Sequence, residues 1–113
     1  MDLNDLLNGH CREYPKGSPT LTPADVQERL PLVPGWDLVD DGKGLRLSRR
    51  MADFLSAVDA VNKAAIVAEE EQHHPDIRIY GYRNLALDLS THSIGGLTDN
   101  DFIMAAKLNR SLG

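Results

Sequence analysis

The sequence predicts a single α+β domain in which a four-stranded, mostly antiparallel sheet carries three helices packed on one face. Three observations lead to this fold class. Hydrophobic periodicity and turn signals give the element order helix, strand, strand, helix, strand, strand, helix, and 113 residues suffice for only one core. Because helices cover only one face, the other face or an edge stays free for self-association, so we expect a homodimer or a homotetramer.

The chain is expected to begin with a flexible N-terminal arm, residues 1–20, ahead of one domain at residues 21–113. The arm mixes charges, glycine, proline and serine without sustained periodicity, so we expect little structure there. The first helix starts at Thr22, because its hydroxyl is a cap and Pro23 suits the first turn. It should stop near Leu30.

A hairpin and then a long helix follow. An extended segment at residues 36–39 breaks at the turn 40–44, and residues 45–51 alternate like a half-buried strand with Arg49 on the apolar side. A capped helix runs from Asp53 to about Gln72. The apolar stripe that we expect to face the core consists of Phe54, Val58, Val61, Ala65 and Ala68.

The last elements are a second hairpin and a final helix. Residues 77–82 and 85–91 indicate two strands with a bend at 81–84. Thr98 and Asp101 stand at capping-box spacing, with Asp in place of Glu. The core side of the final helix is expected to carry Phe102, Ala105, Ala106 and Leu108.

Composition narrows the function classes. The 17 acidic and 12 basic residues give a formal charge of −5, which argues against a nucleic-acid binder or an attraction to anionic membranes. The single cysteine, Cys11, has no internal disulfide partner, and no leader or long apolar run is visible. We therefore expect a soluble cytoplasmic protein that binds a small molecule or another protein.

Three histidines stand where predicted elements end. His73 and His74 close the long helix, because Pro75 disfavours the helical conformation of the residue before it, and His92 follows the fourth strand. Element ends converge on the rims of a two-layer fold, so the three imidazoles are candidates for one acid–base site. A neighbouring carboxylate such as Glu69 can orient an imidazole.

Each of these residues also has a purely structural explanation. A histidine at a helix end interacts favourably with the negative end of the helix dipole, and Asp101 has a sufficient role as a capping residue. A run of glutamates such as residues 69–71 is usually a solvated face. Three glutamates in a last helical turn nevertheless oppose the dipole, which favours a cationic or functional partner for Glu69.

Other chemistries fit the sequence less well. A three-histidine zinc site is disfavoured, because adjacent helical residues point about 100° apart and no HExxH spacing or second cysteine is present. We therefore predict no metal. Cys11 lies in the arm with no base at a defined distance, which disfavours a nucleophilic role. Gly95 and Gly96 precede a helix start and could receive an anion, although a plain turn explains them as well.

The pattern resembles the pterin-4a-carbinolamine dehydratase family. The residues that carry the resemblance are Glu69, His73-His74-Pro75, Tyr82, His92 and Asp101 at their spacing in this chain. It extends from about residue 21 to residue 112, through Pro-Gly-Trp-Asp-Leu at 34–38, Gly-Gly-Leu-Thr at 95–98 and the closing helix.

The resemblance implies loss of water from a 4a-hydroxytetrahydrobiopterin-type carbinolamine, with the pterin as substrate and no cofactor. It implies that His73, His74 and His92 are catalytic and that Glu69 and Asp101 orient them. Pro75, Tyr82 and Thr91 are implied as substrate-binding residues. Which imidazole is the acid and which is the base stays open at this point.

Two features of the chain point to an alternative. Family members often carry aromatic residues where this chain has Arg49, Met51 and Val61, and aromatic residues make up only 5% of the sequence. The C-terminal run also resembles a dehydratase-like branch without catalysis that is associated with RuBisCO assembly in carboxysome-bearing bacteria and chloroplasts. A carboxysome-associated RuBisCO assembly factor is therefore the second hypothesis, and a pocket filled by Arg49 would favour it.

Overall fold

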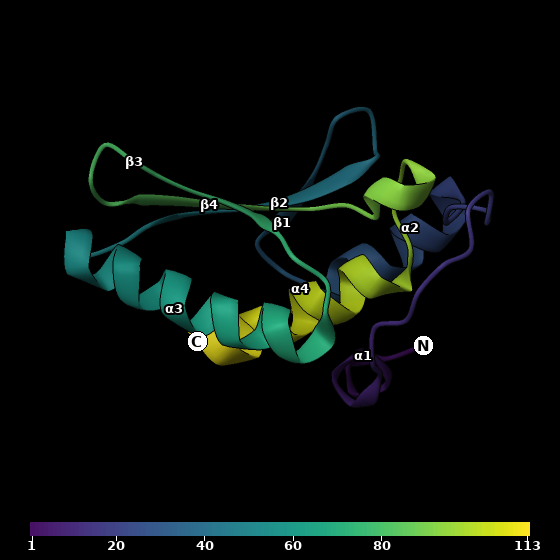
Figure 1. The fold of residues 1–113 in the computed structure, drawn as a ribbon, viewed down its shortest axis with the longest axis horizontal. Helices are drawn as coiled ribbons and strands as arrows, with labels where there is room; N and C mark the ends of the chain where they lie inside the picture. The colour runs from purple at the N-terminus through teal and green to yellow at the C-terminus, as the bar shows by residue number, and fades with distance from the viewer.

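The computed structural model of the protein describes all residues 1–113 and contains one four-stranded antiparallel sheet in the order β1-β2-β4-β3 (Figure 1). The strands are β1 (Trp36–Val39), β2 (Gly44–Arg50), β3 (Asp76–Tyr80) and β4 (Asn84–Leu89). The helices are α1 (Leu3–Asn8), α2 (Pro23–Arg29), α3 (Phe54–Glu71) and α4 (Asp99–Leu112), with 3-10 turns η1 (Leu30–Leu32) and η2 (His92–Ile94). The predicted fold class and element order are confirmed.

The centre of the sheet is the pairing of β2 with β4. Its register places Leu45 opposite Leu89 and Leu47 opposite Leu87, and these four leucines are buried. Helices α3 and α4 cover one face of the sheet (Figure 1). The alternation predicted for residues 45–51 is therefore confirmed. Arg49 occupies the apolar side at the far end of β2, where its guanidinium donates to the carbonyl of Gly113.

The stripe that α3 buries differs from the predicted one. The buried residues of α3 are Ala57, Ala60, Ala64, Ala68 and Glu71, so only Ala68 is shared with the prediction. Small side chains let α3 lie close against α4, whereas the larger Phe54, Leu55 and Ile66 point to solvent. The prediction followed size and hydrophobicity, and the close helix contact selected the alanines instead.

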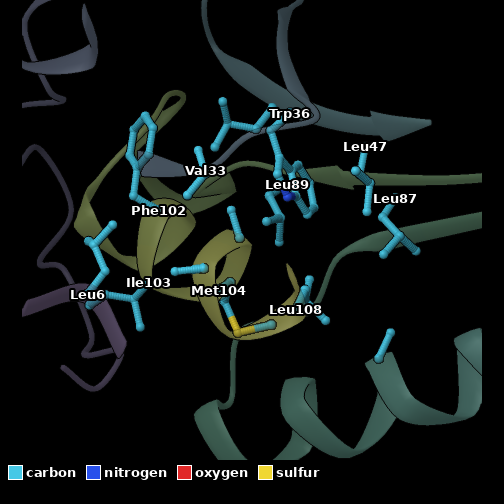
Figure 2. Packing of buried hydrophobic residues seen from close by; sticks show 14 of the residues in the cluster. Leu6, Val33, Trp36, Leu47, Leu87, Leu89, Phe102, Ile103, Met104 and Leu108 are labelled. Carbon is cyan, nitrogen blue, oxygen red and sulfur yellow. The ribbon is translucent and has the colours of Figure 1, made fainter. Parts of the chain in front are cut away.

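The N-terminal residues contain more structure than the sequence led us to expect. Helix α1 begins with a reciprocal capping box between Asp2 and Asp5, and the side chain of Leu6 is only 1% exposed. It lies beside Ile103 of α4 (Figure 2), and α1 packs on α4. Six residues give too short a periodic signal to be recognised in the sequence, because a helix of this length depends on tertiary packing.

Helix α4 is the centre of the core. Its residues 100–108 are all buried, because α1, α3 and the sheet cover it from different sides (Figure 2). Near its end, the Asn109 amide accepts a hydrogen bond from the Trp36 indole at 3.0 Å and donates to the carbonyl of Pro34. The turn before β1 is thereby fastened to α4. None of the helices combines the length and hydropathy that crossing a lipid bilayer requires.

Candidate acid–base site

The end of α3 presents the two adjacent histidines. The helix terminates at Gln72, which adopts the left-handed conformation with φ 51°, and the backbone NH groups of Gln72 and His73 both donate to the carbonyl of Ala68. This arrangement satisfies a helix end, and Pro75 then prevents the helix from continuing. His73 and His74 therefore stand side by side in the connection that leads from α3 to β3.

His73 is held by a buried carboxylate. Its Nε2 lies 2.7 Å from Oδ1 of Asp101, whose side chain is fully buried, while the His73 side chain keeps 12% of its surface exposed. An ionised carboxylate only accepts hydrogen bonds, so Nε2 is the donor. In the neutral ring the lone pair is then on Nδ1, which is free of protein partners.

Asp101 in turn is fixed by two further groups. Its Oδ2 accepts hydrogen bonds from the Thr91 hydroxyl at 2.9 Å and from the backbone NH of Thr98 at 3.0 Å. The hydroxyls of Thr91 and Thr98 are 2.8 Å apart. The capping box predicted from Thr98 and Asp101 is confirmed. One carboxylate therefore starts α4, ties down the end of the fourth strand and orients His73.

His74 has a different environment. Its Nε2 lies 2.5 Å from Oε2 of Glu69, and both side chains face solvent, with 56% and 71% of their surfaces exposed. The predicted association of Glu69 with a histidine is thus present in the geometry, at the surface. Water screens such a pair, so the contact orients His74 weakly.

His92 begins η2, directly after the buried Thr91. The turn closes through Gly95 in the left-handed conformation and through the bridge between Thr91 and Gly96. The His92 ring is exposed and lines a hollow of about 400 Å³ together with Asp40, Arg46, Asp76 and Asp88. Its position is thus coupled to that of His73 through Thr91 and Asp101.

A separate cavity, which we call the His73 hollow, has a volume of about 500 Å³. It is lined by residues 11–14 and 71–73 together with Thr91, Ser93 and Asn100. Within one chain, therefore, neither of these two hollows is lined by all three imidazoles, because His73 lines one, His92 lines the other and His74 lines neither. Arg49 fills neither hollow, since it lies at the opposite end of β2.

Two of the three predicted substrate-binding residues lie near the histidines. Thr91 lines the His73 hollow, and Pro75 follows His74 directly. Tyr82 does not, because it occupies the β3–β4 turn while the histidines lie at the Asp76 end of β3. Strands rise about 3.3 Å per residue, so the four steps from Asp76 to Tyr80 alone separate these ends by roughly 13 Å.

A buried ion cluster beside the His73 hollow was not predicted. Glu71 accepts hydrogen bonds from Lys107 Nζ at 2.7 Å, from the Cys11 backbone NH at 2.7 Å and from His10 Nδ1 at 3.0 Å. Burial raises the pKa of Glu71, but the bonds from Lys107, Cys11 and His10 outweigh it and lower that pKa to about 2. Glu71 lies on the same buried face of α3 as the alanines. Its spacing from Ala64 and Ala68 was the sequence signal that could have predicted its burial.

The Cys11 thiol has low reactivity in this environment. Burial, followed by the neighbouring Glu71 carboxylate, raises the pKa of its thiol to about 12. Thiolate is the reactive form of cysteine, and at neutral pH this thiol stays protonated. No group of three or more His, Cys, Asp and Glu side chains in the protein is arranged like a metal site.

The fold and the histidine–carboxylate pairs describe a small α+β protein with imidazoles at the rim of the sheet. The sequence model described as pterin 4 alpha carbinolamine dehydratase matches residues 19–111. The chain belongs to this family.

Two relatives illustrate the similarity. Pterin-4-alpha-carbinolamine dehydratase 2, mitochondrial, of Arabidopsis thaliana is 44% identical over 91 residues, which are 79% of this chain, and the chain spans about half of that protein, 49%. A relative with the same family name from Xanthomonas oryzae pv. oryzae is 40% identical over 109 residues, 96% of this chain and 92% of the relative.

Two solved structures share the fold. One is the transcriptional coactivator/pterin dehydratase from Brucella melitensis, with a TM-score of 0.76 and 34% identity over 84% of this chain and 100% of that chain. The other is a pterin dehydratase-like protein described as a RuBisCO assembly factor in the alpha-carboxysome, with a TM-score of 0.59. It is 18% identical over 70% of this chain and 90% of that chain, a likeness of fold alone.

Proposed function

We propose that this protein dehydrates pterin-4a-carbinolamines, releasing water from a 4a-hydroxytetrahydropterin to give the quinonoid dihydropterin. The observation that carries the proposal is His73, whose Nε2 is bound to the buried Asp101 while its ring lines an open hollow. Membership in the dehydratase family and the match to relatives over most of the chain support the same reaction. The pterin is the substrate, and the proposal includes no cofactor.

The reaction needs one proton donor and one proton acceptor. The bond from C4a to the hydroxyl oxygen breaks, the proton on N5 leaves, a C4a–N5 double bond forms and water departs. Imidazole suits both tasks, because it exchanges protons near neutral pH. We assign the base to His73, since Asp101 occupies Nε2 and leaves the lone pair of Nδ1 for the N5 proton.

The acid in this proposal is an exposed imidazole. His74, oriented by Glu69, and His92, held next to Thr91, are the two candidates for protonating the departing hydroxyl. Thr91 and Pro75 are proposed to contact the substrate at the histidine end of the sheet. Tyr82 contacts it in this proposal only when a second copy of the chain brings its β3–β4 turn to the site.

Self-association is the second part of the proposal. β1 and β3 are unpaired edge strands, and α3 exposes Phe54, Leu55 and Ile66 at 51%, 76% and 61%. Apolar side chains gathered on one helix are a common basis of homo-oligomers. We expect sedimentation to show a homodimer or homotetramer at micromolar concentration, and a monomer would contradict this part.

The test of function is a dehydration assay with a synthetic carbinolamine. We expect the protein to accelerate water loss over the spontaneous rate and His73→Ala to reduce that acceleration on the order of 10²-fold, as expected for loss of a general base. A protein that does not exceed the spontaneous rate would refute the proposal. Glu28→Gln, on the exposed face of α2, is the matched control and should keep the wild-type rate.

The same protein preparation can also be used to distinguish the dehydratase proposal from the RuBisCO assembly-factor alternative. A RuBisCO assembly factor would raise the yield of assembled RuBisCO on co-expression in the absence of dehydration activity. The structural basis for this alternative is a likeness of fold, and Arg49, whose presence in the hollow would have favoured it, lies outside the hollow. We propose the cytoplasm as the site of action, with carboxysome association belonging to the alternative.

A further inference from the structure

The N-terminal segment supplies one wall of the His73 hollow. Residues 11–14 line this hollow together with His73 and Thr91. The match to the family model begins at residue 19, so the model does not cover this wall, whereas the alignment with the Xanthomonas relative, over 96% of the chain, does. We judge the contribution of the wall to the site from its own contacts.

The wall is fixed in place by the domain. Asn100, which is 4% exposed, clamps the backbone of Arg12, because its Oδ1 accepts from the Arg12 NH at 3.0 Å and its amide donates to the Arg12 carbonyl at 2.6 Å. One residue earlier, the Cys11 NH donates to the buried Glu71 at 2.7 Å. Both anchors use backbone groups, so the side chains that follow are left for other contacts.

The side chains of Arg12 and Tyr14 lie against each other. The guanidinium carbon of Arg12 lies 4.1 Å from the centre of the Tyr14 ring, a cation–π stack. Tyr14 is the only aromatic residue that lines the hollow. This ring stands in a chain whose aromatic content is only 5%.

We propose that the Arg12–Tyr14 stack is the surface on which the pterin ring binds, and that it sets the affinity for substrate while the histidines set the rate. A pterin is a flat conjugated ring system, and stacking on an aromatic or guanidinium plane is the contact such a ring makes best. A hollow of about 500 Å³ lies within the range of small-molecule pockets. The inference rests on the proposed dehydratase function and adds the residues that recognise the ring.

The test separates binding from chemistry. Tyr14→Leu keeps the bulk of the side chain but removes the aromatic plane, so we expect the KM for the carbinolamine to rise about three- to tenfold with kcat within twofold of wild type. Tyr14→Phe retains the plane and should keep the wild-type KM. Calorimetric titration with 7,8-dihydrobiopterin, which has no 4a-hydroxyl to lose, should show the same loss of affinity for Tyr14→Leu.

The matched control is Tyr80→Leu. Tyr80 also stacks against an arginine, with Arg78 4.4 Å from its ring centre, but it lies on β3 outside the His73 hollow. Its KM should equal that of the wild type. Thermal unfolding of each variant shows whether the exchange disturbed the fold instead of the contact.

The possible failures are distinguishable. A wild-type KM in Tyr14→Leu, measured on an active enzyme, would overturn this inference and leave the dehydratase function intact. A fall in kcat with unchanged KM would also overturn it, because it would move Tyr14 from binding to chemistry. A wild-type protein that neither dehydrates the carbinolamine nor binds 7,8-dihydrobiopterin would remove the proposed function, and this inference with it.

Discussion

His73 and His74 are neighbours in the chain, and each directs Nε2 at a carboxylate, yet they belong to two different kinds of pair. The His73–Asp101 pair has a fully buried acid and an imidazole that is 12% exposed. The His74–Glu69 pair has both partners more than half exposed. The two distances are similar, 2.7 and 2.5 Å, so distance does not distinguish the pairs.

What distinguishes them is the set of other groups that hold the carboxylate. Asp101 is bound by Thr91 and Thr98 as well as by His73, so its position is determined before the histidine contributes. Glu69 has only His74 as a side-chain partner and is surrounded by water. An exposed pair contributes about 0 to 1 kcal/mol, whereas breaking a buried one costs about 3 to 5 kcal/mol. The buried pair is the one suited to fix the orientation of a reacting group.

The largest effect is expected from Asp101→Asn. The amide replaces one of the two carboxylate oxygens by an NH2 donor, which faces either His73 at Oδ1 or Thr91 and Thr98 at Oδ2, so the unfolding free energy should fall by about 4 kcal/mol. The dehydration rate of the folded fraction should fall by a factor on the order of 10² because His73 loses its orientation. Urea unfolding and the dehydration assay measure the two effects.

The control for this variant is Asp99→Asn. Asp99 lies in the same first turn of α4 and pairs with Arg29 at 2.8 Å, but its side chain is 39% exposed. It should lose about 1 kcal/mol or less and keep the wild-type rate. Equal losses from Asp99 and Asp101 would show that the comparison between buried and exposed carboxylates does not hold.

The next effect is the response of Glu71 to acid. Its pKa is lowered from 4.5 to about 2 in the folded protein. The stabilisation is therefore complete above pH 4.5 and is lost as the pH falls from 4.5 toward 2, with a total loss of roughly 3 kcal/mol. Urea midpoints measured between pH 6 and pH 2 should show this decline.

Glu71→Gln provides the comparison for this measurement. It removes the titrating group, so the protein should be less stable at pH 6 and its midpoint should change less between pH 4.5 and pH 2. An acid limb as steep in Glu71→Gln as in the wild type would assign the decline to other carboxylates. Glu71 is two residues from Glu69, so the pair of positions tests burial at nearly the same place in the helix.

The smallest effect is expected from Glu69→Gln. The amide keeps a hydrogen-bonding group beside His74 and removes only a solvent-screened charge, so stability should change by less than about 1 kcal/mol. The dehydration rate should fall by no more than about fivefold, the rate equivalent of 1 kcal/mol. A 10²-fold loss would mean that Glu69 acts on the substrate or on His74 far more strongly than its exposure implies.

The elements of the fold could be predicted from the sequence because their signals are local. The Thr22 and Thr98 caps, the Trp36–Val39 strand and the end of α3 before Pro75 depend on residues within a few positions of each other. The buried face of α3 and helix α1 depend instead on what packs against them. Alanine gives little hydrophobic signal, and only the contact with α4 shows why Ala57, Ala60 and Ala64 are buried.

The sequence predicted which residues belong to the candidate site better than it predicted how they are placed relative to one another. The His73–Asp101 contact joins residues 28 positions apart, and the sequence provided both residues but not their distance. Sequence reasoning selected Glu69 from the glutamate run, whereas the structure buries Glu71 with Lys107. The contact of Glu71 with the N-terminal segment could not be predicted from the sequence. A segment without hydrophobic periodicity gives no indication of the surface on which it packs.

Asp101 has two roles, because the same carboxylate caps the N-terminus of helix α4 and orients His73. A related protein without dehydratase activity would still need this carboxylate to start α4, whereas no catalytic role would keep a histidine at position 73. An aspartate at this position in a related protein therefore indicates the shared fold, whereas a histidine paired with it indicates that the acid–base site is present.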